Sequence, residues 1–174
     1  YNFDADYQIG IKNNCNRLLI IDDVAHQEFY FADIILNQNI SGTNVHYNCH
    51  DETKLLLGTD YVLLRDEFLK YKQRNKKIHP VANNILVTTG GSDPENVTLR
   101  VMNVLDKLKI ENLKIKVIIG SNNPNSNSLK KESKKLKHNI DLLYSPQDIP
   151  ELMAWADVAV SSGGSTVWEL AFMG

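Results

Sequence analysis

The sequence of 174 residues lacks several features that would define a class of protein at once. Cysteine occurs only at positions 15 and 49, too sparsely for a disulfide framework, and this scarcity favours a reducing compartment. No signal peptide and no apolar run of membrane-spanning length is present, so we expect a soluble protein of the cytoplasm without membrane insertion. The 19 basic and 21 acidic residues leave a net charge of −2, which excludes a global field that recruits nucleic acid or an acidic membrane.

The composition is sufficient for a globular protein with a hydrophobic core. Hydrophobic residues make up 43% of the chain, and 174 residues suffice for one domain or one and a half. The chain begins at Tyr1 instead of Met and stops at Gly174, within or just after an expected helix. We therefore interpret it as a fragment of a longer protein, whose oligomeric state and fused domains these residues do not reveal.

Residues 1–64 are predicted to be the end of an N-terminal α/β domain. Within them, residues 17–23 (RLLIIDD) form a short apolar run ending in two aspartates, as a parallel strand does at the edge where ligands bind. Asp22 and Asp23 are interpreted as structural, because such an aspartate more often caps the following helix than binds a metal. Two further strands are expected, at 33–37 and 61–64.

The loop between these strands holds several potential metal ligands: His46, Cys49, His50, Asp51 and Glu52. Their spacing matches no zinc pattern, and a solvated loop is the simpler interpretation. We therefore expect neither a metal site nor a cofactor here.

The segment 65–84 is charged, contains Pro80 and lacks an apolar stripe, which is typical of a linker between domains. In residues 85–174, strands alternate with helices: strands at 85–89, 116–119, 140–144 and 157–160, and helices at 96–108, 129–136 and 149–155. This alternation predicts an α/β domain with a doubly wound, Rossmann-like parallel sheet. The first helix is expected to turn five residues inward: Val97, Val101, Val104, Leu105 and Leu108. The lysines of the second helix are expected to form a solvated face.

Two glycine-rich loops are expected at one edge of this sheet, because right-handed crossovers place all the strand C-termini there. The first loop, residues 90–94 (GGSDP), should start a helix at Asp93 and Pro94. The second loop, residues 161–166 (SSGGST), precedes an apolar helical pattern. Either loop alone is consistent with an ordinary turn, but the pair suits the diphosphate of a nucleotide.

The second loop has the features of a phosphate site. Gly163 and Gly164 allow positive φ and a close approach of ligand to backbone, and Ser165 and Thr166 are expected to cap the helix. The N–H groups beyond them would attract a phosphate. Thr166 and Glu169 also have the spacing of a capping box, so an ordinary helix start after a tight turn remains the alternative.

Four stretches together resemble a known family, and they occur in the family's order: IDDVAHQEFYFADIILNQN (21–39), LLLGTDYVLLRDEF (55–68), ILVTTGGSDPENVT (85–98) and SSGGSTVWEL (161–170). They are similar to the UDP-2,4-diacetamido-2,4,6-trideoxy-β-L-altropyranose hydrolases of pseudaminic acid biosynthesis and to proteins of spore coat polysaccharide biosynthesis. That family is related to the peptidoglycan N-acetylglucosaminyl transferase. The resemblance spans almost the whole chain.

The resemblance implies a two-domain glycosyltransferase-B fold used for metal-independent hydrolysis of a UDP-sugar, with water in place of a sugar acceptor. The products would be UDP and the free 2,4-diacetamido-2,4,6-trideoxy sugar. A glycosyltransferase with a UDP-sugar donor and a non-catalytic nucleotide-binding module remain the alternatives, because both would keep the same loops.

By the same resemblance, the UDP site lies on residues 85–174. The phosphates would meet Gly163, Gly164, Ser165 and Thr166, with Gly91 and Ser92 facing them. Glu169 would bind the ribose hydroxyls, and the backbone at Ile149, in the loop 145–149, would read uracil. The family's catalytic histidine belongs to an early loop that nothing here matches, and five histidines are not substitutes for it: His26, His46, His50, His79 and His138. We therefore expect the chain alone to be inactive.

Overall fold

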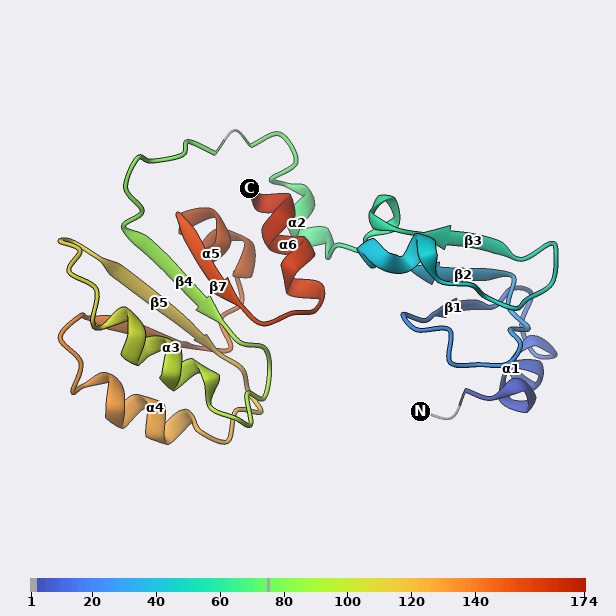
Figure 1. Ribbon diagram of the computed structural model, residues 1–174, viewed down its shortest axis with the longest axis horizontal. Coiled ribbons are helices and arrows are strands. Elements are labelled where there is room, and N and C mark those ends of the chain that lie inside the picture. Colours follow the sequence, from blue (N-terminus) through green and yellow to red (C-terminus); the bar gives the residue numbers. More distant parts are fainter. Residues whose placement is uncertain (1–2, 75) are drawn as a thin grey trace. The chain divides into compact units, whose positions relative to one another are not determined.

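The computed structural model describes residues 3–74 and 76–174, and it contains two compact units (Figure 1). One unit ends at Leu63 and the other comprises Leu64–Gly174. Each unit has its own parallel β-sheet. The predicted α/β class is therefore confirmed.

In its described part, residues 3–63, the first unit consists of a small sheet with one α-helix and two short 3-10 helices. Its elements are α1 (Ala5–Lys12), β1 (Leu19–Ile21), β2 (Ile34–Asn37), β3 (Lys54–Leu57) and 3-10 turns at Ile40–Asn44 and Thr59–Tyr61. The strands are parallel in the order β1-β2-β3. Their core contains Tyr30, Ala32, Ile35 and Tyr47. We propose that this unit is the end of an N-terminal domain.

The strand predicted at 61–64 is wrong. The third strand is Lys54–Leu57, which pairs with β2 over four residues. Gly58 then turns the chain with a φ of 96°, and a 3-10 turn follows. The N–H of Leu63 donates to the side chain of Gln38 and not to a neighbouring strand. The apolar run at 61–64 was misleading because a glycine had already ended the strand.

We had expected one of the two aspartates after β1 to cap a helix. Asp22 instead closes a turn. Its carboxylate accepts hydrogen bonds from the N–H groups of Val24 and Ala25 at 2.9 and 3.2 Å, and from the hydroxyl of Tyr30. Burial alone would raise the pKa of Asp22, but the hydrogen bonds, led by that from Tyr30, lower it below its usual value. The structural interpretation of this buried aspartate fits these contacts, whereas Asp23 is exposed.

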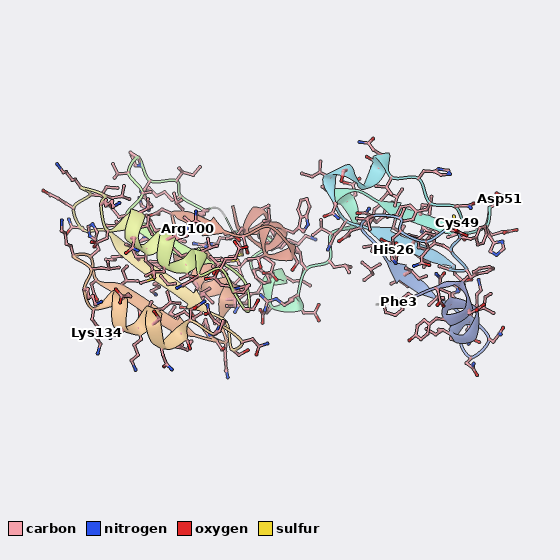
Figure 2. The ribbon with its side chains drawn as sticks, turned by 60° about the horizontal axis from the view of Figure 1, so that its bottom comes forward. Phe3, His26, Cys49, Asp51, Arg100 and Lys134 are labelled. Carbon is pink, nitrogen blue, oxygen red and sulfur yellow. The ribbon has the colours of Figure 1, made fainter. Side chains whose placement is uncertain are left out.

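The potential metal ligands of the loop 46–52 do not gather into a site. Figure 2 shows Cys49 and Asp51 on this loop of the first unit, with His26 on the segment after β1. In residues 3–74 and 76–174, no group of three or more His, Cys, Asp or Glu side chains could hold a metal ion. Nor is any helix of these residues long and apolar enough to cross a membrane.

The segment predicted as a linker, 65–84, falls within the second unit, and its first residues are packed into the core of that unit. It contains α2 (Asp66–Leu69), and Phe68 is fully buried beside Leu86 and Met153. Phe68, with Tyr71 packed against the same core, thus anchors a segment that has no apolar stripe.

The second unit is a doubly wound parallel sheet, as predicted. Its elements are β4 (Asn84–Thr88), α3 (Val97–Leu105), β5 (Lys114–Ile119), α4 (Ser126–Ser133), β6 (Ile140–Tyr144), α5 (Ile149–Trp155), β7 (Val158–Ser161) and α6 (Ser165–Met173). The strand order is β6-β5-β4-β7, and every pair is parallel. The two strands that precede the glycine loops, β4 and β7, are therefore neighbours.

Helices cover both faces of this sheet (Figure 1). Ile85 and Val87 point into a core with α3 and α4, and Leu86 between them points into a second core with α5 and α6. This alternation follows from the two-residue period of a strand. The lysines of α4 lie outside these cores, and Lys134 at its C-terminal end is exposed (Figure 2).

The inward face predicted for α3 is partly wrong. Its buried residues are Thr98, Met102 and Leu105, whereas the side chain of Val104 is 60% exposed. Thr98 is held at the sheet by a 2.7 Å hydrogen bond between its hydroxyl and that of Thr89. The buried face of the helix thus includes a polar residue, which hydrophobicity alone did not indicate.

Candidate functional site

The two glycine loops lie side by side at the carboxyl edge of the second sheet. The N–H of Ser162 donates to the carbonyl of Thr88 at 3.2 Å, which continues the pairing of β7 with β4. A Cβ atom on Gly90 would lie 3.7 Å from the hydroxyl oxygen of Ser162. The fold thus brings together two loops that are some 70 residues apart in the sequence.

The loop after β7 leads directly into α6. The helix begins at Ser165, with Gly164 as N-cap at a φ of 122°. Within the described part of the chain no side chain caps this helix. Ser165 and Thr166 lie in the first turn, so the predicted caps and the capping box of Thr166 with Glu169 are wrong. The positive end of α6 therefore has no side-chain acceptor and meets an exposed loop.

The two glycines of this loop are not equivalent. Only Gly164 of the pair has positive φ, which corrects the expectation for Gly163. A Cβ on Gly163 would meet no protein atom within 4 Å, so its backbone is open to a ligand. Ser165 is exposed and Thr166 is half-buried.

The loop after β4 presents Gly91 and Ser92 to solvent and buries Asp93. The carboxylate of Asp93 accepts hydrogen bonds from the N–H groups of Val97 and Thr98, the first two residues of α3, at 2.8 and 3.0 Å, although the N-cap of this helix is Asn96 and not Asp93. Pro94, however, lies in a turn before the helix, which begins at Val97. Burial would raise the pKa of Asp93, but the bonds from Thr98, Val97 and Thr89 hold it below its usual value.

Gly120, directly after β5, supports the loop at Gly91, and our sequence reasoning missed it. A Cβ on Gly120 would lie only 2.3 Å from the carbonyl oxygen of Gly91. Asn125 adds a second brace, since its amide donates to the carbonyl of Asp93 at 3.0 Å. A glycine at the end of a predicted strand was the available signal for this close approach.

Glu169 is buried on α6 and is paired with Arg65, a residue that sequence reasoning had placed in the linker. Its Oε1 accepts a hydrogen bond from Nε of Arg65 at 2.8 Å. This hydrogen bond, opposed by partial burial, raises the pKa of Arg65 above its usual value. The predicted site residue is thus fixed by a partner 104 positions away.

Ile149 is the first residue of α5, a helix that packs against α6 and β4. Asp148 caps this helix through a 3.0 Å hydrogen bond from the N–H of Glu151. Ser145 turns the preceding loop with a φ of 44°. Through α5, the loop 145–149 is thereby tied to the elements that carry the other candidate residues.

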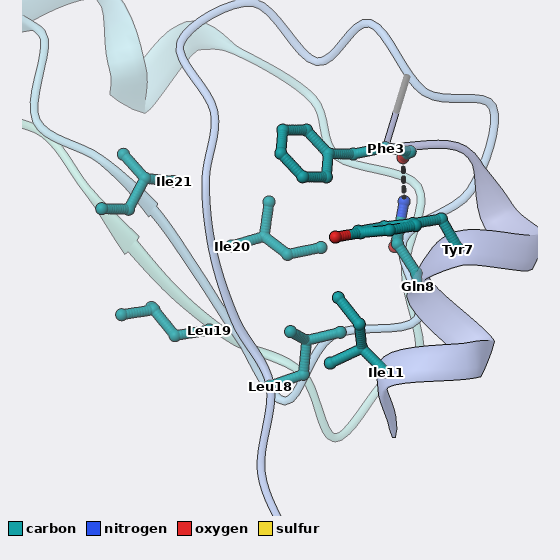
Figure 3. A pocket seen from close by; sticks show the side chains of 8 residues that line it. All are labelled: Phe3, Tyr7, Gln8, Ile11, Leu18, Leu19, Ile20 and Ile21. Carbon is teal, nitrogen blue, oxygen red and sulfur yellow. Dashed lines mark hydrogen bonds between the residues drawn. The ribbon is translucent and has the colours of Figure 1, made fainter. Parts of the chain in front are cut away.

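A cavity of about 320 Å³ lies elsewhere, between α1 and β1 of the first unit (Figure 3). Its walls are mainly apolar: Phe3, Tyr7, Ile11 and residues 18–21, together with Gln8. The amide of Gln8 is already engaged, since it donates to the carbonyl of Phe3 and accepts from the N–H of Phe31, both at 2.9 Å. Such a cavity does not suit a charged ligand, and the sheet edge remains the candidate.

The parallel sheet with glycine loops at its carboxyl edge defines the second unit as a Rossmann-like domain of the glycosyltransferase-B type. Residues 84–174 match the family described as "Glycosyltransferase family 28 C-terminal domain", and the chain belongs to this family.

Curated proteins of three organisms are similar to the chain. A protein of Methanocaldococcus jannaschii described as uncharacterised is 29% identical, over 98% of this chain and 37% of its own length. The spore coat polysaccharide biosynthesis protein SpsG of Bacillus subtilis is 22% identical, over 91% and 46%. The UDP-2,4-diacetamido-2,4,6-trideoxy-β-L-altropyranose hydrolase of Campylobacter jejuni is 29% identical, over 97% and 59%. The resemblance inferred from the sequence is confirmed, and the chain spans between 37% and 59% of the length of these relatives.

Proposed function

We propose that the chain is the UDP-binding part of a UDP-sugar hydrolase that releases UDP and a free 2,4-diacetamido-2,4,6-trideoxy sugar. The sugar would serve pseudaminic or another nonulosonic acid, or a surface polysaccharide. One observation carries this proposal: two glycine loops meet beside an uncapped helix N-terminus, in a unit of the glycosyltransferase 28 family. The names of the relatives from Campylobacter jejuni and Bacillus subtilis support the substrate class.

The diphosphate would bind at the start of α6. The backbone at Gly163 and Gly164 admits it, the hydroxyls of Ser165 and Thr166 donate to it, and Gly91 and Ser92 face it. Negative charge grows on the diphosphate as it leaves the anomeric carbon. N–H donors already in place at a helix N-terminus stabilise this charge without reorganisation.

The nucleoside would extend along α6 and α5. Glu169 would accept hydrogen bonds from the ribose hydroxyls, and the backbone at Ile149 would contact the edge of uracil. Because α5 packs against α6, both contacts would come from one rigid pair of helices.

The general base would come from outside this chain. Two histidines belong to the second unit, and neither lies at the glycine loops: Nε2 of His138 is 2.9 Å from the carbonyl oxygen of Leu108, and His79 lines a hollow with Asn84, at the amino end of β4. We place the base on a segment of the longer protein, as the resemblance implies.

A UDP-sugar-dependent glycosyltransferase is the second candidate, because the matched family is one of glycosyltransferases. The two functions share the proposed UDP site and differ in the acceptor. Product analysis of the longer protein with and without candidate acceptor sugars separates them. A chain that binds UDP but belongs to no active protein would be a nucleotide-binding module.

The proposed site is tested by titration calorimetry of the chain with UDP and with uridine. We expect UDP to bind at least about tenfold more tightly, because only the diphosphate meets the N-terminus of α6. Because the chain spans only 37% to 59% of the length of its relatives, we expect weak binding, with a Kd on the order of tens of micromolar to millimolar. Equal affinity for UDP and uridine in a folded chain would refute the phosphate site.

A further inference from the structure

Arg65 stands two residues after the boundary between the two units and contacts the buried carboxylate of Glu169. The distance from Arg65 Nε to Glu169 Oε1 is 2.8 Å, and the side chain of Glu169 is only 10% exposed. A carboxylate at this depth requires a charged or hydrogen-bonding partner, and Arg65 supplies both. The orientation of the carboxylate is therefore set by the guanidinium.

Arg65 is itself held on two sides. Its Nη1 lies 2.7 Å from Oε1 of Glu67, and its Cζ lies 5.1 Å from the ring centroid of Phe68. Phe68 is fully buried in the core of the second unit. A planar guanidinium that is paired with one carboxylate and stacked on a fixed ring offers its remaining N–H donors in a fixed direction.

The second oxygen of Glu169 is open. Throughout the described residues no hydrogen bond reaches Oε2, and this atom is not among the fully buried ones without a partner. A carboxylate oxygen with free lone pairs accepts hydrogen bonds from hydroxyl groups. Arg65 thus occupies one oxygen of Glu169 and leaves the other available to a ligand.

We propose that Arg65 is a positioning residue that aims Glu169 at the ribose and so sets the preference of the site for ribonucleotides over 2′-deoxyribonucleotides. This inference rests on the proposed UDP site. It assigns to the first residues of the second unit a part in nucleotide recognition, through a side chain that acts on Glu169. A merely structural ion pair would stabilise the unit without affecting this preference.

The test compares UDP with 2′-deoxy-UDP on the whole chain by titration calorimetry, beside a melting curve for each variant. The wild type should prefer UDP by about tenfold, the value expected for one charge-assisted hydrogen bond. Arg65→Gln should reduce this preference to about threefold or less, because the carboxylate loses its anchor. Its affinity for 2′-deoxy-UDP should stay within about twofold of the wild type, since the phosphate loops are untouched.

Arg74→Gln is the matched control. Arg74 belongs to the same segment and lies near an aromatic ring, at 5.9 Å from that of Tyr71, but it donates to the carbonyl of Ala154 and not to Glu169. The Arg74 variant should keep the tenfold preference. Glu67→Gln weakens one contact of Arg65 without removing the guanidinium. It should lower the preference for UDP, but by less than Arg65→Gln. If Arg65→Gln does not fold, Glu67→Gln tests the inference in its place.

A folded Arg65→Gln variant with the preference of the wild type would overturn the inference and leave the proposed function standing. The same holds if Glu67→Gln is the folded variant and the preference is unchanged. A wild-type chain that binds UDP and 2′-deoxy-UDP equally would overturn the ribose role of Glu169, and the inference with it. A wild-type chain that does not bind UDP at all would refute the proposed function itself.

Discussion

Gly163 and Gly164 are neighbours, but only Gly164 has a positive φ, so substitution by alanine should affect the two positions differently. Gly164→Ala should destabilise the chain by about 1–2 kcal/mol, because a φ of 122° is strained for any residue with a Cβ. Gly163→Ala should leave the melting temperature nearly unchanged, since its Cβ meets nothing within 4 Å. The added methyl should nevertheless weaken UDP binding, because it occupies the space proposed for a phosphate. Calorimetry and melting curves on both variants check this, and a Gly163→Ala chain with wild-type UDP affinity would contradict the contact.

Glu169→Gln tests the ribose contact at the same scale. Gln keeps an acceptor for Arg65 but loses the charge that strengthens hydrogen bonds from ribose hydroxyls. We expect UDP affinity to fall by about tenfold or more, while stability falls by about 1 kcal/mol because the side chain of Arg65 is half exposed. Titration calorimetry beside thermal melting separates the two effects. Unchanged UDP affinity in a folded variant would show that the ribose role is wrong.

At the scale of elements, Asp157 joins the starts of β7 and β4. Its Oδ2 accepts from the N–H groups of Asn84 and Asn83 at 2.9 and 3.0 Å, and the first of these bonds is the main reason that its pKa lies below the usual 3.8. The stability that ionised Asp157 contributes is therefore present above about pH 4 and is lost as the pH falls through the lowered pKa.

Asp157→Asn should accordingly cost about 1 kcal/mol at pH 7 and less at pH 3. Thermal melting at the two pH values measures the difference. Asp141→Asn, at an exposed position of β6, is the control and should change stability little at either pH. An equal loss of stability at both pH values would mean that the charge of Asp157 does not contribute to holding the starts of β7 and β4 together.

At the scale of the whole molecule, the chain carries a proposed nucleotide site, and neither histidine of the second unit, His79 or His138, lies at the glycine loops. General acid–base catalysis contributes roughly a hundred- to ten-thousand-fold to a rate. We therefore expect the purified chain to release no UDP from UDP-sugars above the blank, whereas the longer protein should. A coupled assay for UDP measures both. Turnover by the chain alone that is insensitive to Glu169→Gln would show that the proposed catalytic arrangement is wrong.

The sequence by itself determined the class of fold and most elements of the second unit. The strand at 140–144 and the helix at 149–155 were located to the residue, because apolar periodicity and capping residues are local signals. The parallel direction of the strands followed from the alternation of strands and helices, since a helix between two strands of one sheet lets the second strand run parallel to the first. The resemblance of four motifs then indicated the family.

Only the tertiary structure decided which residues meet. The pair of Arg65 and Glu169, the close approach of Gly120 to Gly91, and the hydrogen bond between Thr98 and Thr89 all depend on contacts between separate elements. Local periodicity carries no information about such partners, because a polar contact between distant positions leaves no repeat in the sequence. The same reason explains the false strand at 61–64: its apolar residues were visible in the sequence, but the pairing of Lys54–Leu57 with β2 was not.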